Sequence, residues 1–199
     1  MTINKLPNQD DVQHGSGIRG VDEHFLASAP RGFSAASSGG ATVEDTRYGR
    51  YIGGSNTAGN TANQRGFHGA AAGEFSKDVL TLDMWVLDAP FTDDVEIGMM
   101  QQGGINQDKG AYLDLTAEEY HVGANTAPAT IPGSFSSLSL TIEMDHEANE
   151  TAFSLSGAVG EEVTISEKDV GRNRFMYYNS NGNGERSPAV IRYKRRLVP

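Results

Sequence analysis

Residues 135–157 read FSSLSLTIEMDHEANETAFSLSG, and this stretch decides the fold. Its first half alternates apolar with polar residues, and the apolar ones are Leu138, Leu140, Ile142 and Met144. A strict period of two is typical of a β-strand with one buried and one wet face. The alternation returns over Thr151–Leu155 after a short polar run. The stretch therefore predicts two antiparallel strands joined by a turn.

The same period of two recurs along the rest of the second half of the chain. It extends over residues 78–88, 94–101 and 189–197, and more briefly around Val163 and Ile165. Clusters of Gly, Asn and Pro separate these runs, and no window of a dozen residues has the 3.6-residue period of a helix. Many strands with almost no helix predict an all-β protein built as an antiparallel β-sandwich.

The first 74 residues differ in composition from the rest. They hold 13 of the 24 glycines, and short hydrophobic islands such as Phe25 and Phe33 interrupt the polar sequence. Such a segment buries too little apolar surface to offset the entropy of ordering itself alone. We expect a β-sandwich domain over residues 75–199, preceded over residues 1–74 by an extended Gly-rich arm with short strands. The arm either contacts a neighbouring molecule through Phe25 and Phe33 or is pinned to the domain's own core.

Composition excludes several classes of protein. The 199 residues contain no cysteine, which rules out disulfides, thiolate metal sites and thiol nucleophiles. The net charge of −10 argues against nucleic acid as a partner, because phosphates would be repelled. No run approaches the ~20 apolar residues of a membrane-spanning helix, and the polar N-terminus does not resemble a secretory signal. We expect neither a nucleic acid nor a membrane as partner.

Basic residues gather at the C-terminus. The last 14 positions contain no acidic residue and five basic ones, Arg186, Arg192, Lys194, Arg195 and Arg196. The favoured interpretation is a solvated edge strand whose charges prevent edge-to-edge pairing. The alternative is an assembly contact with an acidic neighbour, such as another copy of the chain, through the last four of these residues.

Four motifs between Val79 and Val163 follow one another in a recognisable order. They are LTLDMWV at 80–86, AYLDL at 111–115, LSLTIEM at 138–144 and TAFSLSG at 151–157. In this order they resemble the concanavalin A-like lectin/glucanase superfamily, particularly its laminin-G-like branch. The resemblance implies a jelly roll of two curved sheets. Members of this superfamily are glycosidases or polysaccharide lyases, glycan-binding proteins or structural proteins.

No residue is assigned a catalytic role. The resemblance implies alternating carboxylates of the type E-x-D-x-x-E for a glucanase, and this sequence has no such motif. Glu143 and Asp145 have the two-residue spacing, but Asp145 begins a turn, and Glu96 lies at a strand start. Asp145 and Glu147 are candidate ligands for Ca²⁺, although a solvated hairpin turn is favoured there. No cofactor is otherwise expected.

Aromatic rings and amides are the candidates for contact with a glycan or another partner. The candidate residues are Trp85, Tyr120, Tyr177, Tyr178, Asn181 and Asn183. Tyr177 and Tyr178 are adjacent in a strand and point to opposite faces, so one of them is expected to be exposed. The two asparagines lie in the loop that follows, and binding residues concentrate at loop tips.

These features predict a non-enzymatic structural or accessory protein of a larger assembly. The expected assembly is a phage virion, in which the domain decorates a capsid or forms part of a tail or head fibre. The expected partners are protein neighbours in a homo-oligomer. The alternatives are a carbohydrate-binding, lectin-like module that recognises a surface glycan, and a glycosidase or polysaccharide lyase of the same fold.

Overall fold

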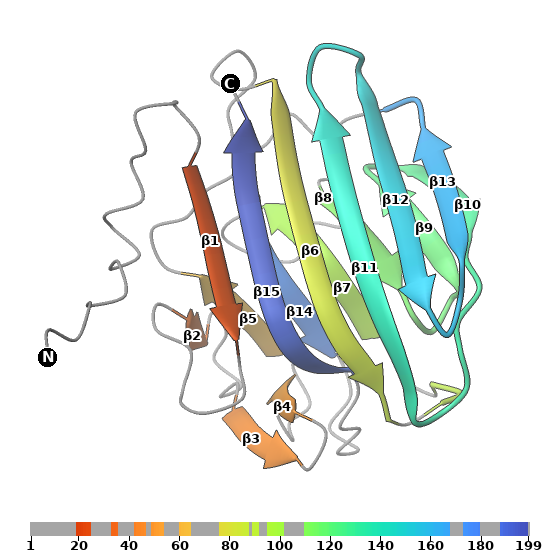
Figure 1. The fold of residues 1–199 in the computed structure, drawn as a ribbon. Helices are drawn as coiled ribbons and strands as arrows, with labels where there is room; N and C mark the ends of the chain where they lie inside the picture. The colour runs from red at the N-terminus through yellow and green to blue at the C-terminus, as the bar shows by residue number, and fades with distance from the viewer. Residues whose placement is uncertain are drawn as a thin grey trace, which may run out of the picture.

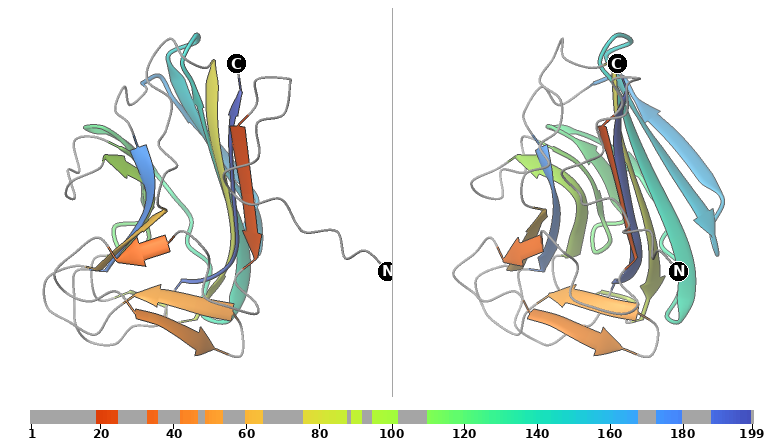
Figure 2. Two further views of the ribbon diagram at one scale, coloured as in Figure 1. Left: turned by 90° about the vertical axis from the view of Figure 1, so that its left-hand side faces the viewer. Right: turned by 60° about the vertical axis from the view of Figure 1, so that its left-hand side comes forward.

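All regular structure in the described part of the chain is β-strand. The computed structural model describes residues 19–24, 33–35, 42–46, 49–53, 60–64, 76–87, 89–91, 95–101, 110–167, 173–179 and 188–198. They contain fifteen antiparallel strands in two sheets, which face each other as the layers of a sandwich (Figure 1, Figure 2). The predicted all-β antiparallel sandwich is confirmed. No helix in these residues is long and apolar enough to cross a membrane.

The larger sheet has eight strands and lies nearer the viewer in Figure 1. Its order is β13 (Glu161–Ile165), β12 (Glu150–Gly157), β11 (Ser136–Asp145), β6 (Lys77–Val86), β15 (Ala189–Val198), β4 (Gly49–Gly53) and β3 (Thr42–Thr46), with β1 (Arg19–His24) also paired to β15. The basic strand β15 is therefore hydrogen-bonded to β6 along one side and to β1 and β4 along the other. It is not an edge strand, so the interpretation of its charges as edge protection is wrong.

The smaller sheet has seven strands. Its order is β10 (Asn125–Pro128), β9 (Glu119–Val122), β8 (Gly110–Asp114), β7 (Val95–Gln101), β14 (Asn173–Asn179), β5 (Asn60–Gln64) and β2 (Phe33–Ala35). The strands β7 to β10 follow one another both in sequence and in space, so each turn joins neighbouring strands. The strands from Val95 to Pro128 thus supply four of the seven strands of the sheet.

The core lies between the sheets, where the alternating apolar residues meet. The predicted hairpin is confirmed, because β11 pairs with β12 from Leu138–Gly157 to Asp145–Glu150. The apolar side chains that fill the core from four of the strands are Leu80, Leu82 and Met84 of β6, Ile97 of β7, Leu113 of β8, and Leu138, Leu140 and Ile142 of β11. Each buried side chain of this size contributes roughly 1.5–3 kcal/mol.

A charged pair is buried among these apolar residues. The Arg195 guanidinium donates to both carboxylate oxygens of Asp78, with Nε–Oδ1 at 3.0 Å and Nη2–Oδ2 at 2.6 Å. Both side chains have almost no exposed surface. Arg195 was a predicted assembly contact, and that prediction is wrong because the side chain is fully buried and bound to Asp78.

The N-terminal segment contributes strands to both sheets. β1, β3 and β4 belong to the eight-stranded sheet, and β2 and β5 belong to the seven-stranded sheet. Phe33 is the first residue of β2 and pairs with Gln64 of β5. Phe25 lies outside the described residues. The boundary at residue 74 and the neighbour contact of the arm stay predictions.

Candidate functional site

A row of carboxylates crosses the outer face of the seven-stranded sheet, which is turned away from the core. The register sets Glu96 of β7 opposite Asp114 of β8, and Asp114 opposite Glu119 of β9. Opposed residues in such a ladder have Cβ atoms about 4.5–5.5 Å apart. Exposure rises along the row, because Glu96 is buried, at 2%, whereas Asp114 and Glu119 are half-buried. The row therefore opens towards β9 and β10.

An aromatic row lies directly beside the carboxylates. Tyr112 of β8 pairs with His121 of β9, which pairs with the exposed Thr126 of β10. The rings of Tyr112 and His121 stack with centroids 4.6 Å apart and planes 5° apart. This stack fixes the imidazole plane at the surface of the sheet.

A glycine makes room for the stack. Gly98 of β7 pairs with Tyr112, and a Cβ placed on Gly98 would lie 2.5 Å from the Ala111 carbonyl oxygen and 2.6 Å from the Tyr112 Cα. Both are backbone atoms, so neither can rotate away. The close approach of β7 to β8 at this point requires glycine.

The turn from β8 to β9 holds Asp114 in place. Its Oδ1 accepts hydrogen bonds from the backbone N–H groups of Thr116 and Ala117, both at 2.8 Å. The Thr116 hydroxyl in turn accepts the Val95 N–H at 3.0 Å, which ties the turn to the start of β7. Asp114 Oδ2 receives no hydrogen bond from the described residues, so it remains a fixed acceptor on this face.

Glu119 and His121 lie two residues apart on the outer side of β9. Glu119 Oε2 is 3.5 Å from His121 Nε2. Together with the preceding groups they bring an imidazole, two carboxylates and a hydroxyl onto three adjacent strands, and the Tyr112 ring, itself only 1% exposed, packs against the imidazole and supports it. We call Tyr112, Asp114, Glu119, His121 and Thr126 the outer-face cluster. None of the predicted contact residues whose side chains the structure describes belongs to this cluster.

Tyr120 was a predicted contact residue, and the structure contradicts that role. Its ring is fully buried in the core and packs against Phe153 of β12, with centroids 4.8 Å apart. Burial, together with the neighbouring Glu161 carboxylate, raises the pKa of the Tyr120 hydroxyl. A side chain with no exposed surface cannot stack on a sugar, so Tyr120 is a core residue.

The other predicted aromatic contacts are divided between the two sheets. Trp85 is half-buried on the outer side of β6, in the eight-stranded sheet, opposite Ser137. In β14, Tyr178 pairs with Glu96 and so falls in the register of the carboxylate row, whereas Tyr177 pairs with the core residue Ile97. Asn181 and Asn183 lie outside the described residues.

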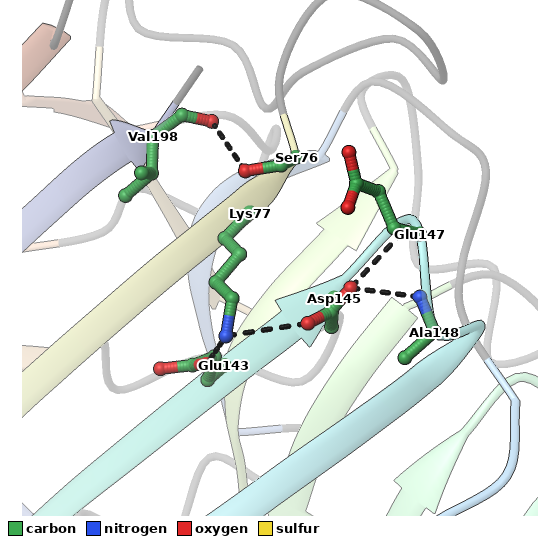
Figure 3. Close-up of polar contacts among 7 residues, drawn as sticks. All are labelled: Ser76, Lys77, Glu143, Asp145, Glu147, Ala148 and Val198. Carbon is green, nitrogen blue, oxygen red and sulfur yellow. Dashed lines mark hydrogen bonds and ion pairs between the residues drawn. The ribbon is translucent and has the colours of Figure 1, made fainter.

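The acidic turn after β11 is closed by the protein itself (Figure 3). Asp145 Oδ1 accepts the backbone N–H groups of Glu147 and Ala148, and Asp145 Oδ2 lies 3.2 Å from Lys77 Nζ. The same ammonium donates to Glu143. The Asp145 carboxylate is thus saturated, which does not fit a calcium site with Glu147. No group of three His, Asp or Glu side chains in the described part of the chain could hold a metal ion.

The hydrogen bonds at this turn predict a pH-dependent contribution to stability. The N–H groups of Ala148 and Glu147, together with Lys77, lower the pKa of Asp145 in the folded chain. The stabilisation is therefore present above the unfolded pKa of about 3.9 and is lost as the pH falls through the lower folded value. We expect Asp145→Asn to lower the urea midpoint at pH 7 and to have little effect near pH 2. Glu147→Gln is the matched control, and an Asp145→Asn deficit of equal size at both pH values would contradict this account.

Two of the remaining predicted assembly residues are exposed. Lys194 and Arg196 of β15 have exposed side chains, whereas Arg192 is half-buried. All three occupy the outer side of β15, because they alternate with the buried Arg195 and Leu197. Their role in assembly stays a prediction.

The solved structures that this chain resembles include several lectins. No family model and no curated protein matches the sequence. Arcelin-5, a lectin-like defence protein from Phaseolus vulgaris, superposes with a TM-score of 0.65 at 9% identity, covering 91% of this chain and 98% of that one. Lectin I from Ulex europaeus, in complex with a methyl glycoside of α-L-fucose, gives 0.64 at 10% identity, covering 92% and 99%.

A third match is part of an enzyme. A chain described as a sialidase superposes with a TM-score of 0.57 at 9% identity, and the match covers 90% of this chain but only 18% of that one. The matched region is therefore a small part of the sialidase. These likenesses extend over nearly the whole of the present chain. The chain therefore has the concanavalin A-like jelly-roll fold of the legume lectins.

Proposed function

We propose that the chain is a carbohydrate-binding, lectin-like module whose glycan lies on the outer-face cluster. The observation that supports this most is the His121 imidazole, which is held by its stack on the buried Tyr112 ring and lies beside Asp114 and Glu119 on one face of a single sheet. The lectin fold adds general support. The proposal favours the lectin alternative over a structural role in a virion. The structural role stays a prediction.

The chemistry of the cluster suits sugar hydroxyl groups. Carboxylates accept O–H donors in short, charge-assisted hydrogen bonds, and Asp114 Oδ2 and the Glu119 carboxylate are available for them. An imidazole can donate from one nitrogen and accept at the other, as a sugar hydroxyl also can. The turn hydrogen bonds of Asp114 and the ring stack of His121 hold these groups before binding, which reduces the entropy lost on association.

We propose binding without hydrolysis. A retaining glycosidase needs two carboxyl groups about 5–5.5 Å apart, one of them a buried general acid. The three carboxylates weighed as a catalytic pair in the sequence do not lie together. Glu143 and Asp145 bind Lys77 on the eight-stranded sheet, whereas Glu96 belongs to the seven-stranded sheet. In the carboxylate row, Glu119 is only partly exposed, Glu96 opposite Asp114 is 2% exposed and so is closed to a glycan, and Asp114 Oδ1 accepts two turn N–H groups.

A glycan array followed by titration calorimetry tests the proposal. We expect the wild type to bind at least one glycan, and Glu119→Gln or His121→Ala to weaken that binding by about 10- to 100-fold, the effect of one hydrogen bond to a charged group. Glu118→Gln, an exposed neighbour outside the cluster, should bind as the wild type does. Wild-type protein that binds no glycan, or variants that all bind equally, would refute the site.

A further inference from the structure

The four strands that carry or adjoin the outer-face cluster have an excess of negative charge. Residues 110–135, which include β8, β9 and β10, contain three acidic residues and no lysine or arginine. Strand β7 adds Glu96 and also has no lysine or arginine. The only basic side chain on these four strands is His121, and one imidazolium offsets at most one of their negative charges.

The next strand of the same sheet does not supply the missing cation. The one basic residue of β14 is Arg174, which lies opposite Met100 of β7. Met100 is four residues along β7 from Glu96, a distance of about 14 Å. Asp114 and Glu119 follow one and two strands farther across the sheet. Both carboxylates are therefore beyond the reach of an arginine side chain on β14.

Asp114 and Glu119 lie directly opposite each other, which is unfavourable unless a cation joins them. They form a cross-strand pair between β8 and β9, so their Cβ atoms are about 4.5–5.5 Å apart. Like charges in this position destabilise a sheet. A cation between the two carboxylates removes the repulsion and adds charge-assisted hydrogen bonds. The pair therefore favours a positively charged ligand.

Carboxylates of the eight-stranded sheet show how the protein neutralises such charges with its own side chains. Asp78 is bound by the Arg195 guanidinium, and Glu143 and Asp145 share the Lys77 ammonium. The cross-strand pair of the outer face has no lysine or arginine partner within the part of the chain that the structure describes. Its charge is left for a ligand to neutralise.

An ammonium group suits this pair better than a metal ion does. Ca²⁺ takes six to eight oxygen ligands, whereas an ammonium has three N–H donors and one charge. The described residues contain no group of three side chains that could hold a metal ion. Asp114 Oδ2 is a fixed acceptor, because two turn N–H groups hold the other oxygen, and the half-buried Glu119 provides the second carboxylate.

We propose that the glycan of the outer-face cluster is an amino sugar with a free amine, such as a glucosamine oligomer, whose ammonium lies between Asp114 and Glu119. This assignment rests on the proposed function, because it names the class of sugar that the same site takes. N-acetylation removes the positive charge of the amine, and a uronic acid brings a further negative charge to the two carboxylates. The site therefore prefers the free amino sugar and excludes acidic sugars.

Titration calorimetry with three tetrasaccharides tests the assignment. They are the tetramers of glucosamine, N-acetylglucosamine and galacturonic acid. Salt at about 0.15 M screens the general attraction between a cation and a protein of net charge −10. We expect the wild type to bind the glucosamine tetramer at least about tenfold more tightly than the N-acetylglucosamine tetramer, the effect of one hydrogen bond to a charged group. The galacturonic acid tetramer should not bind.

Two variants of unchanged shape show whether the preference comes from the carboxylate pair. Asp114→Asn keeps an oxygen for the turn N–H groups, and Glu119→Gln keeps the length of the side chain, but each removes one negative charge. We expect each to weaken glucosamine binding by about 10- to 100-fold and to change the weak N-acetylglucosamine binding little. Glu118→Gln removes a charge from an exposed residue outside the cluster and should keep the wild-type preference.

Several results would overturn the amino-sugar assignment. One is equal affinity of the wild type for the glucosamine and N-acetylglucosamine tetramers, and another is a loss of preference in Glu118→Gln as large as in Glu119→Gln. A third is displacement of the glucosamine tetramer by a lysine oligomer of equal charge with the same affinity, because the site would then recognise charge alone. A neutral glycan that binds preferentially, and that His121→Ala weakens, would overturn the sugar class while supporting the glycan site. Absence of binding to any glycan would overturn both.

Discussion

Arg195→Met is expected to lower the free energy of unfolding by about 3–5 kcal/mol, because it leaves the Asp78 carboxylate buried without its partner. Nε and Nη2 of Arg195 donate to the two oxygens of Asp78 at 3.0 and 2.6 Å, inside the sandwich. Neither side chain is more than 1% exposed, so water cannot replace the lost hydrogen bonds. Urea unfolding at pH 7 measures the loss.

The double variant Asp78→Leu/Arg195→Met distinguishes the loss of stability caused by an unpaired buried charge from the net contribution of the ion pair to the free energy of unfolding. Replacing both partners of a buried ion pair by apolar residues is often neutral or stabilising. We therefore expect the double variant to be markedly more stable than Arg195→Met. The single variant Asp78→Leu completes the cycle. If the double variant instead loses the sum of the losses of Arg195→Met and Asp78→Leu, the two side chains are not coupled and the explanation fails.

Strand β15, which contains Arg195, illustrates which features can be predicted from the sequence and which cannot. A cluster of basic residues at 192–196 is visible at once, and alternation assigns them to two faces. Arg195 lies between Tyr193 and Leu197, two apolar residues at the same-face spacing, so the signal for its burial was present. Its partner Asp78 is 117 residues away, and no local pattern joins the two.

The strands themselves were predictable because each is half-buried. The alternation over residues 135–157 led directly to β11, β12 and the turn between them. The order of strands within each sheet was not predictable from local periodicity. For this reason β15 was placed at an edge, although it lies between β6 and β1.

Like the position of β15, the outer-face cluster depends on which strands pair and in which register. Glu119 and His121 alternate with the apolar Tyr120 and Val122, which is enough to place Tyr120 in the core and His121 outside. The alternation alone therefore predicts a buried Tyr120, in conflict with its prediction as a contact residue. The stack of Tyr112 on His121 could not be read from the sequence, because it requires knowing that these two residues face each other.

Gly98→Ala is expected to destabilise the protein by about 3 kcal/mol and to remove glycan binding together with it. The added Cβ would lie 2.5 Å from the Ala111 oxygen and 2.6 Å from the Tyr112 Cα, and backbone atoms in the middle of a sheet cannot move without parting β7 from β8. Overpacking of this kind costs about 1–3 kcal/mol or more. Displacement of Tyr112 also removes the ring that supports His121.

Gly160→Ala is the matched control, because a Cβ at Gly160 meets nothing within 4 Å. We expect it to change the free energy of unfolding by no more than about 0.5 kcal/mol and to leave glycan binding intact. Both variants are compared by urea unfolding and by glycan titration at a temperature where each is folded. A folded Gly98→Ala protein that binds glycan like the wild type would show that the Tyr112–His121 stack is not part of the site. Loss of binding in folded Gly98→Ala, with Gly160→Ala unchanged, would tie recognition to the close approach of β7 and β8, since neither glycine has a side chain that could touch a ligand.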